Sequence, residues 1–302
     1  MTNRQPHIQT NSFKAWCIAA RPKTLSGAAV PVMIGLAHAF ADTAGTSTFQ
    51  WTPAVLCMLF AFVMQINANL INDFFDFKKG IDDTSLRLGP RRACAQQWIT
   101  LHAMKHAIAG VTCLACALGL PLVYFGGLAM ILIGVLCVVF CFLYTTHLSG
   151  KGLGDVLVLV FFGIVPVCAT YYIQCHHLTW QVFLSSISCG LVIDTLLVVN
   201  NYRDRFTDLL HRKMTLVIRI GEKRSRLLYF HLGMAACLLG IVHCFHGQPM
   251  AFVLPLLYLL MHTFTYLHIV RIDRGKALNL CLGETARNMF FYGLLVSVGL
   301  LL

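Results

Sequence analysis

The chain has 302 residues, of which 58% are hydrophobic and only 12% are charged, and it carries a formal net charge of +11. Soluble domains hold about 25% charged residues, so this composition excludes an ordinary soluble enzyme and indicates an integral membrane protein. The basic excess does not indicate a nucleic-acid partner, because the Lys and Arg residues gather in a few loops between apolar stretches.

Nine apolar stretches follow one another, each about 17–25 residues long, the length that a helix needs to cross the hydrocarbon core. They cover residues 24–41, 53–77, 103–121, 126–144, 154–174, 180–203, 225–246, 249–271 and 285–302. Residues 1–13 are polar, and no cleaved secretory signal is expected. The sequence therefore predicts an all-α, polytopic membrane protein, with about nine transmembrane helices in a bundle around a central cavity and one domain over residues 1–302.

The basic residues occupy alternate loops of this arrangement. The 23 Lys and Arg residues lie before or at the first span and around the junctions of spans two and three, four and five, six and seven, and eight and nine. The intervening segments contain none; they lie around residues 42–52, 122–125, 175–179 and 247–248. By the positive-inside rule, the N-terminus and the basic loops are expected in the cytoplasm.

Spans two and six each end in a patch of amide and carboxylate side chains. The patches are Asn72-Asp73-Phe74-Phe75-Asp76 and Asn200-Asn201-Tyr202-Arg203-Asp204, the second running on to Asp208. Residues four apart on a helix share a face, so Asn72 points the same way as Asp76, and Asp204 the same way as Asp208. Because both patches are expected on the cytoplasmic side, we expect them to face each other.

Such a pair of oxygen clusters suits Mg²⁺, which takes one or two carboxylates and completes its shell with water and substrate phosphate. The candidate metal ligands are Asn72, Asp73, Asp76, Asp204 and Asp208. Nearby basic residues would meet a diphosphate directly; they are Lys78, Lys79, Arg91, Arg92, Arg203, Arg212 and Lys213. The alternative is that the acids only pair with these bases at the membrane surface, and the matched placement of two patches favours the metal site.

Asp194 is a separate acid in the middle of span six, about 15 Å along a helix from Asp204. An intramembrane acid is a functional candidate by default. It can also be a protonated side chain that hydrogen-bonds a neighbouring helix, and we favour that structural role.

The two patches resemble the aspartate motifs of a known group, the UbiA-type superfamily of intramembrane aromatic prenyltransferases. Asn72-Asp73-x-x-Asp76, with the later Asp82, is similar to the first motif, and Asn201-x-Arg203-Asp204-x-x-x-Asp208 to the second. Where the general family has a third acid, this chain has Gly80, and the next acids are Asp82 and Asp83. Asp82 is therefore a weaker candidate ligand than the others.

Further segments are similar to one branch, the 1,4-dihydroxy-2-naphthoate polyprenyltransferases of menaquinone synthesis. These segments are Asp76-Phe77-x-Lys79-Gly80-x-Asp82 with Arg87-Leu88-Gly89-Pro90, Ala20-Arg21-Pro22-Lys23-Thr24, Gly152-Leu153-Gly154-Asp155, and Lys213-x-Thr215-Leu216-x-x-Arg219-x-Gly221. The chain departs from the branch at Arg212-Lys213-Met214-Thr215, where the branch usually has Gly-Lys-Arg-Thr. Because of this difference, the sequence does not decide which residues of this loop contact the diphosphate.

The resemblance implies a Mg²⁺-dependent enzyme of the bacterial cytoplasmic (inner) membrane. Such an enzyme transfers a polyprenyl group from an allylic polyprenyl diphosphate to 1,4-dihydroxy-2-naphthoate, with loss of CO₂, and gives demethylmenaquinol. The implied catalytic acids are Asp73, Asp76, Asp204 and Asp208, and the implied diphosphate-binding residues are Arg203, Lys213, Tyr144 and Arg92. Arg21 would meet the carboxylate of the acceptor. No general base is obvious in the sequence.

Three other functions compete with this one. A related prenyltransferase, with 4-hydroxybenzoate as its acceptor or with haem as the acceptor of a farnesyl group, is disfavoured by the Asp-Phe-x-Lys-Gly spacing. A CDP-alcohol phosphotransferase would carry Asp-Gly-x-x-Ala-Arg, which is absent from the sequence. A cation-coupled transporter would hold its acids near the bilayer midplane, where only Asp194 lies.

Overall fold

The computed structural model describes residues 8–44, 48–81 and 87–302, and within these residues the regular structure is helical. The first half contains α1 (Phe13–Ala20), α2 (Leu25–Thr43), α3 (Trp51–Lys78), α4 (Leu101–Gly126) and α5 (Ala129–Leu143). The second half contains α6 (Gly154–Val158), α7 (Val165–Cys175), α8 (Trp180–Leu210), α9 (Leu216–Ile220), α10 (Glu222–Leu239), α11 (Val242–Phe245), α12 (Met250–Val253), α13 (Leu256–Ile272) and α14 (Leu278–Leu301). Short turns of other helix types join them: η1 (Pro22–Thr24), η2 (Tyr144–Leu148), η3 (Ser149–Lys151) and η4 (Leu159–Ile164).

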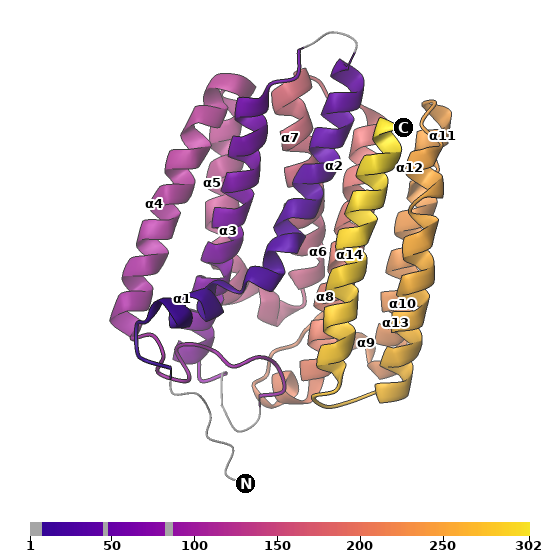
Figure 1. Cartoon of the computed structure of the whole chain (residues 1–302). Helices are drawn as coiled ribbons and strands as arrows, with labels where there is room; N and C mark the ends of the chain where they lie inside the picture. Colours follow the sequence, from indigo (N-terminus) through magenta and orange to yellow (C-terminus); the bar gives the residue numbers. More distant parts are fainter. Residues whose placement is uncertain (1–7, 45–47, 82–86) are drawn as a thin grey trace.

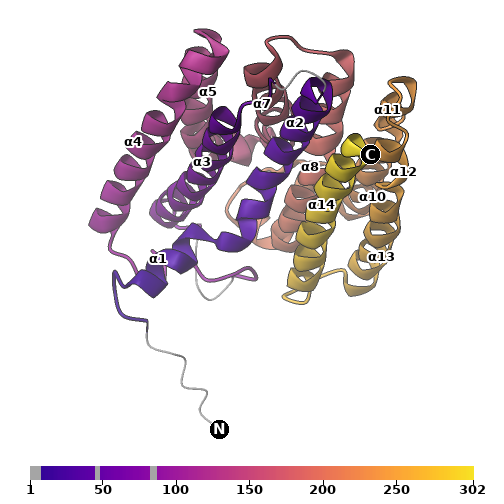
Figure 2. The ribbon, with the colours of Figure 1, turned by 45° about the horizontal axis from the view of Figure 1, so that its top comes forward.

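The long helices run side by side as one bundle (Figures 1 and 2). Eight helical segments of the described chain are long and apolar enough to cross a membrane: Phe13–Thr43, Trp51–Lys78, Leu101–Gly126, Ala129–Lys151, Gly154–Cys175, Trp180–Leu210, Glu222–Phe245 and Met250–Ile272. α14 lies alongside them and packs on α2 and α13, but it is more polar in its first half. The predicted all-α membrane class is confirmed, and the predicted count of about nine holds approximately.

Helices α3, α8 and α13 all end at the same end of the bundle, which we call the basic end (Figure 1). The short α1 lies across this end, and most of the Lys and Arg residues lie around the ends of α3, α8 and α13, in the loops that follow them and in the helical turns that come next. The alternation of charge along the chain thus becomes a separation of charge between the two ends of the bundle.

The lengths of α3 and α8 carry the acid patches past the apolar layer. α3 has 28 residues and α8 has 31, which correspond to about 42 and 46 Å of helix. The hydrocarbon core is only about 30 Å thick. α8 begins at the opposite end of the bundle, where the Thr179 hydroxyl accepts a hydrogen bond from the Val182 amide and caps the helix. Because α8 is longer than the hydrocarbon core is thick, its last residues are expected to reach the polar interface.

α8 is the central helix of the bundle and packs against α10, α14, α7 and η4. Its contact with η4 is close because two glycines meet there: a Cβ atom on Gly163 would lie 2.6 Å from the Gly190 Cα. Small residues allow membrane helices to approach in this way. This packing brings α6, which precedes η4 and contains Asp155, against the middle of α8.

Candidate active site

The first patch presents two oxygens on one face at the end of α3. Asn72 Oδ1 accepts a hydrogen bond from the Thr145 hydroxyl of η2, and the Asp76 carboxylate lies 3.5 Å from Nη2 of Arg92. Asp76 is four residues after Asn72, as the helical spacing predicts. Arg92 comes from the loop between α3 and α4, so loop and helix meet at this carboxylate.

Asp73 occupies a different position from the other predicted ligands. Its side chain is only 1% exposed, and its two oxygens accept the backbone amides of Ala93 and Cys94, each at 2.9 Å. Amides that donate to a carboxylate form strong, charge-assisted hydrogen bonds. In this structure Asp73 therefore anchors the loop that carries Arg92, rather than pointing with Asn72 and Asp76; its role as a metal ligand stays a prediction.

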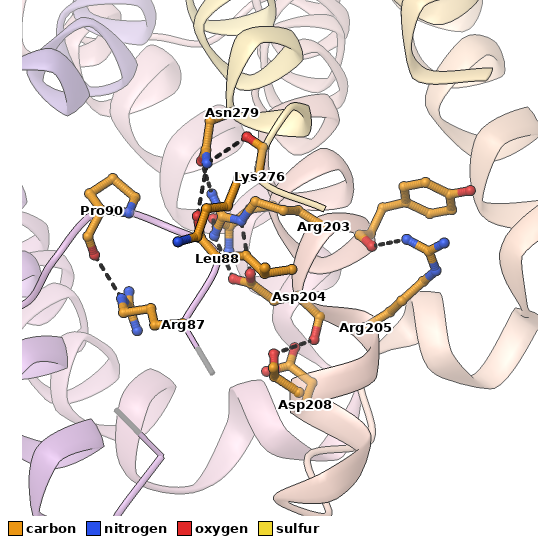
Figure 3. Close-up of polar contacts among 12 residues, drawn as sticks. Arg87, Leu88, Pro90, Arg203, Asp204, Arg205, Asp208, Lys276 and Asn279 are labelled. Carbon is orange, nitrogen blue, oxygen red and sulfur yellow. Dashed lines mark hydrogen bonds and ion pairs between the residues drawn. The ribbon is translucent and has the colours of Figure 1, made fainter. Parts of the chain in front are cut away.

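In the second patch, Arg203 holds Asp204 in place (Figure 3). The Arg203 guanidinium donates to both carboxylate oxygens of Asp204, through Nε at 2.8 Å and through Nη2. It also donates to the side-chain oxygens of Asn200 and Asn279, each at 2.9 Å. Because Arg203 is only 3% exposed and each of its nitrogens donates within the protein, its present geometry orients Asp204 and offers little contact to a diphosphate.

Asn279 of α14 was not predicted as a site residue. Its side-chain amide donates to the backbone oxygens of Leu88, at 2.8 Å, and Lys276, at 2.9 Å. One amide thus joins the loop after α3, the start of α14 and the Arg203–Asp204 pair (Figure 3). No local pattern in the sequence marks it, because its partners lie far away along the chain.

Asp208 is the acid with unused binding capacity. Oδ1 of Asp208 lies 3.5 Å from Nζ of Lys213, whereas Oδ2 is buried and has no hydrogen-bond partner among the described residues. The residue is only 5% exposed. A buried carboxylate oxygen without a partner is costly, so this atom indicates a ligand that the chain itself does not supply.

The two patches converge on one region. The charge of Asp208 interacts electrostatically with those of Lys213, Asp204 and Asp76. Lys213 acts in turn on Asp76, at the end of α3. Acids from two helices, together with Lys213, therefore lie in one region at the basic end of the bundle, where their charges act on one another.

Two other predicted residues, Arg21 and Tyr144, lie near the same region of charged side chains. Arg21 acts electrostatically on Asp76. Tyr144, at the start of η2, interacts electrostatically with Asp76 and Asp208 among other acids. Asp82 and Asp83 lie outside the described residues.

The backbone at Arg21 is held in an uncommon conformation. Arg21 has φ 51°, in the left-handed region, and ends α1 before Pro22 begins the next turn. On α3, the Asn69 amide donates to the backbone oxygen of Ala20 and to the Thr24 hydroxyl, each at 2.9 Å. These bonds fix the turn that carries Arg21 against α3, a support that the sequence did not reveal.

By their chemistry the residues present fit a Mg²⁺ ion, although no three His, Cys, Asp or Glu side chains of the described residues are grouped closely enough to hold a metal ion in this structure. Asn72, Asp76, Asp204 and Asp208 supply amide and carboxylate oxygens, which are the hard ligands that Mg²⁺ prefers, and few enough to leave positions for water and phosphate. Of this set, Oδ2 of Asp208 is buried and has no hydrogen-bond partner among the described residues. Lys213 and Arg92 pair with two of these acids, so the volume that a cation would fill is bordered by groups that balance a bound anion.

The chain matches the family model described as "UbiA prenyltransferase family" over residues 28–294. The 1,4-dihydroxy-2-naphthoate octaprenyltransferase of Mycobacterium leprae (strain TN) is 34% identical over 235 residues, which cover 76% of this chain and 78% of that protein. The protein of the same name from Escherichia coli (strain K12) is 34% identical over 245 residues, or 78% and 76% of the two chains. UbiA prenyltransferase domain-containing protein 1 of Mus musculus is 28% identical over 316 residues, or 99% and 88%.

Solved structures share the architecture. A UbiA homolog from Archaeoglobus fulgidus, bound to DMAPP and Mg²⁺, superposes with a TM-score of 0.66 at 13% sequence identity, covering 94% of this chain and 99% of that one. The apo structure of a UbiA homolog from Aeropyrum pernix K1 gives a TM-score of 0.63 at 14% identity, with 90% and 97% covered. At these identities the likeness concerns the fold.

Proposed function

This chain belongs to the UbiA prenyltransferase family, and from that premise we propose that it transfers a polyprenyl group from an allylic polyprenyl diphosphate to 1,4-dihydroxy-2-naphthoate. We further propose that CO₂ is lost in the reaction and that demethylmenaquinol is the product. The observation that supports the proposal is that Lys213 lies 3.5 Å from Asp208 at the end of α8 and also acts electrostatically on Asp76 at the end of α3. The naphthoate acceptor is proposed because the relatives at 34% identity bear its name.

In the proposed mechanism, Asn72, Asp76, Asp204 and Asp208 would hold Mg²⁺ at the basic end. When bound, Mg²⁺ supplies positive charge that stabilises the departing diphosphate. The protein surrounds the same volume with fixed cations, and preorganised charges of this kind favour the transition state because they need no rearrangement.

Four further residues have proposed roles around the bound substrates. Lys213 and Arg92 contact the diphosphate when they leave their present carboxylate partners. Tyr144 donates a hydrogen bond to the leaving group. Arg21 binds the carboxylate of the acceptor, because a guanidinium matches a carboxylate with two parallel hydrogen bonds. Arg203 acts on the diphosphate through Asp204, whose carboxylate it orients.

The proposed setting is a bacterial cytoplasmic membrane with the basic end in the cytoplasm, which follows from the positive-inside rule. A water-soluble diphosphate head and a carboxylated acceptor then reach the acids from the cytoplasm. The prenyl tail stays among the membrane helices.

An acceptor panel with one fixed polyprenyl diphosphate donor tests the proposal. Membranes that contain the protein should prenylate 1,4-dihydroxy-2-naphthoate and release labelled CO₂ from the carboxyl-labelled acceptor, and excess EDTA should abolish the product. Preference for 4-hydroxybenzoate would refute the acceptor assignment, and retention of the carboxyl label in the product would refute the decarboxylation. Full activity in EDTA would refute the metal.

A further inference from the structure

Two buried acids that the proposed mechanism does not use lie on neighbouring segments. Asp155 of α6 is 9% exposed and Asp194 of α8 is 5% exposed. Oδ1 of each is buried without a hydrogen-bond partner among the described residues. Because such oxygens are costly in an apolar interior, two of them together indicate a proton or a ligand group that the chain alone does not provide.

The packing of η4 on α8 places these acids opposite each other. The segments approach so closely that a Cβ atom added to Gly154 would lie 3.4 Å from Cδ2 of Leu197. A Cβ atom added to Gly163 would lie 2.6 Å from the Gly190 Cα. The two segments therefore run antiparallel in this contact, and the register places Asp155 and Asp194 on facing stretches of α6 and α8, where their charges act on each other. Two neighbouring carboxylates in a low-dielectric interior disfavour ionisation of both, so such a pair is suited to sharing one proton.

Tyr144 connects this acid pair to the proposed metal site. Among the acids, Tyr144 interacts electrostatically most strongly with Asp155, and less strongly with Asp194, Asp76 and Asp208. A Cβ atom on Gly154 would lie 3.7 Å from its hydroxyl oxygen. Tyr144 thus lies near both sets of acids and links the pair to the proposed metal site.

We propose that Asp155 and Asp194 are a proton-exchanging pair that binds the hydroxyl group next to the reacting carbon of the acceptor. The inference rests on the proposed function. When the allylic carbon bonds to the ring carbon that bears the carboxylate, the hydroxyl proton moves to the ionised member of the pair and the oxygen becomes a carbonyl. When the bond to CO₂ breaks, its electron pair enters the ring, and the pair returns the proton to that oxygen.

This cycle explains why a shared proton is useful here. The pair ends with the same number of protons that it held at the start, so no proton needs to enter from water, which would quench the allylic cation. The substrate hydroxyl also supplies the partner that the two Oδ1 atoms lack. A purely structural pair would satisfy itself and would be indifferent to the acceptor.

The test compares Asp194→Asn, and independently Asp155→Asn, with the wild type in lipid vesicles. Asn keeps the shape of the side chain but cannot accept the proton. With 1,4-dihydroxy-2-naphthoate we expect kcat to fall about 10²-fold or more, the contribution typical of general acid–base catalysis. With a fluorinated acceptor whose hydroxyl is already ionised at the assay pH, the loss should be less than about ten-fold, because no proton then needs to be accepted.

Two controls separate catalysis from folding. Thermal stabilisation by Mg²⁺ with the polyprenyl diphosphate, measured without acceptor, should match that of the wild type. Ser188→Ala removes another buried polar group of α8, whose hydroxyl donates to the Leu184 oxygen, and should leave kcat unchanged.

Three results would overturn the inference: both Asn variants as active as the wild type, equal losses with both acceptors, or loss of the stabilisation by donor. Failure of the proposed function looks different, because the wild type itself would then reject the naphthoate. If the wild type prenylates 4-hydroxybenzoate instead, the same comparison of the variants with that acceptor decides the inference. If the wild type prenylates no aromatic acceptor, both proposals fall.

Discussion

Asp208 is the residue whose removal should harm the proposed reaction most, because its buried Oδ2 has no partner among the described residues. We predict that Asp208→Asn lowers prenyl transfer about 10²–10³-fold, since it removes one charge that holds the metal beside the leaving group. Steady-state assays in vesicles measure this. Asp42→Asn is the control, because Asp42 pairs with Tyr171 on other elements of the bundle; turnover by Asp208→Asn at the level of this control would remove Asp208 from the site.

Arg203 should affect the metal indirectly, through the carboxylate that it orients. A lysine cannot reproduce the two hydrogen bonds to Asp204 together with those to Asn200 and Asn279. We predict that Arg203→Lys and Asn279→Ala each raise the Mg²⁺ concentration needed for half-maximal activity about ten-fold, as other residues that orient metal ligands do. A Mg²⁺ titration checks this, and an unchanged requirement in both variants would show that the network is only structural.

Asp273 should make stability depend on pH at the basic end. The hydrogen bond from Tyr202, at 2.7 Å, and the nearby Arg205 and Arg226 lower the pKa of this carboxyl. A lowered folded-state pKa stabilises the protein above the ordinary aspartate pKa, and that contribution disappears as the pH falls through the folded value, below about 4. Asp273→Asn should therefore melt earlier than the wild type at pH 7, with the difference shrinking below about pH 4.

Melting curves from pH 3 to 8 in detergent would measure this difference. Asn tolerates the positive φ of 59° at this position, so the substitution tests the charge rather than the backbone. A difference that stays constant across the whole pH range would contradict the assignment.

At the scale of the elements, the loop between α3 and α4 depends on Asp73. Its two oxygens hold the amides of Ala93 and Cys94, and the next residue back is Arg92, which reaches Asp76. We predict that Asp73→Ala speeds hydrogen exchange at residues 91–98 and lowers activity by releasing the loop. Asp76→Asn should lower activity without faster exchange there, so equal exchange in the two variants would refute the anchoring role.

At the scale of the whole molecule, the basic end should face the cytoplasm. The 23 Lys and Arg residues alternate between loops, and all the helices that lead to the acids end on that side (Figure 1). A reporter that is active only outside the cytoplasm should therefore be active when fused after Gly247 and silent when fused after Gly275. Activity at both positions, or the reverse pattern, would contradict the proposed orientation.

The sequence by itself determined the membrane class, the approximate spans and the two oxygen patches at the ends of spans two and six. These features are local: a run of apolar residues predicts a span, and a spacing of four places Asn72 and Asp76 on one helical face. The proposed cytoplasmic orientation likewise depends only on which loops contain Lys and Arg.

Only the tertiary structure decided what each polar side chain meets. Asp73 points to a loop twenty residues further on, Asn279 bonds Leu88 from 191 residues away, and the close approach of Gly163 and Gly190 brings the segment of Asp155 against that of Asp194. Such partners are brought together by packing between helices, and the direction of a polar side chain in an apolar interior is set by whichever partner the packing supplies. No spacing along the chain encodes that choice.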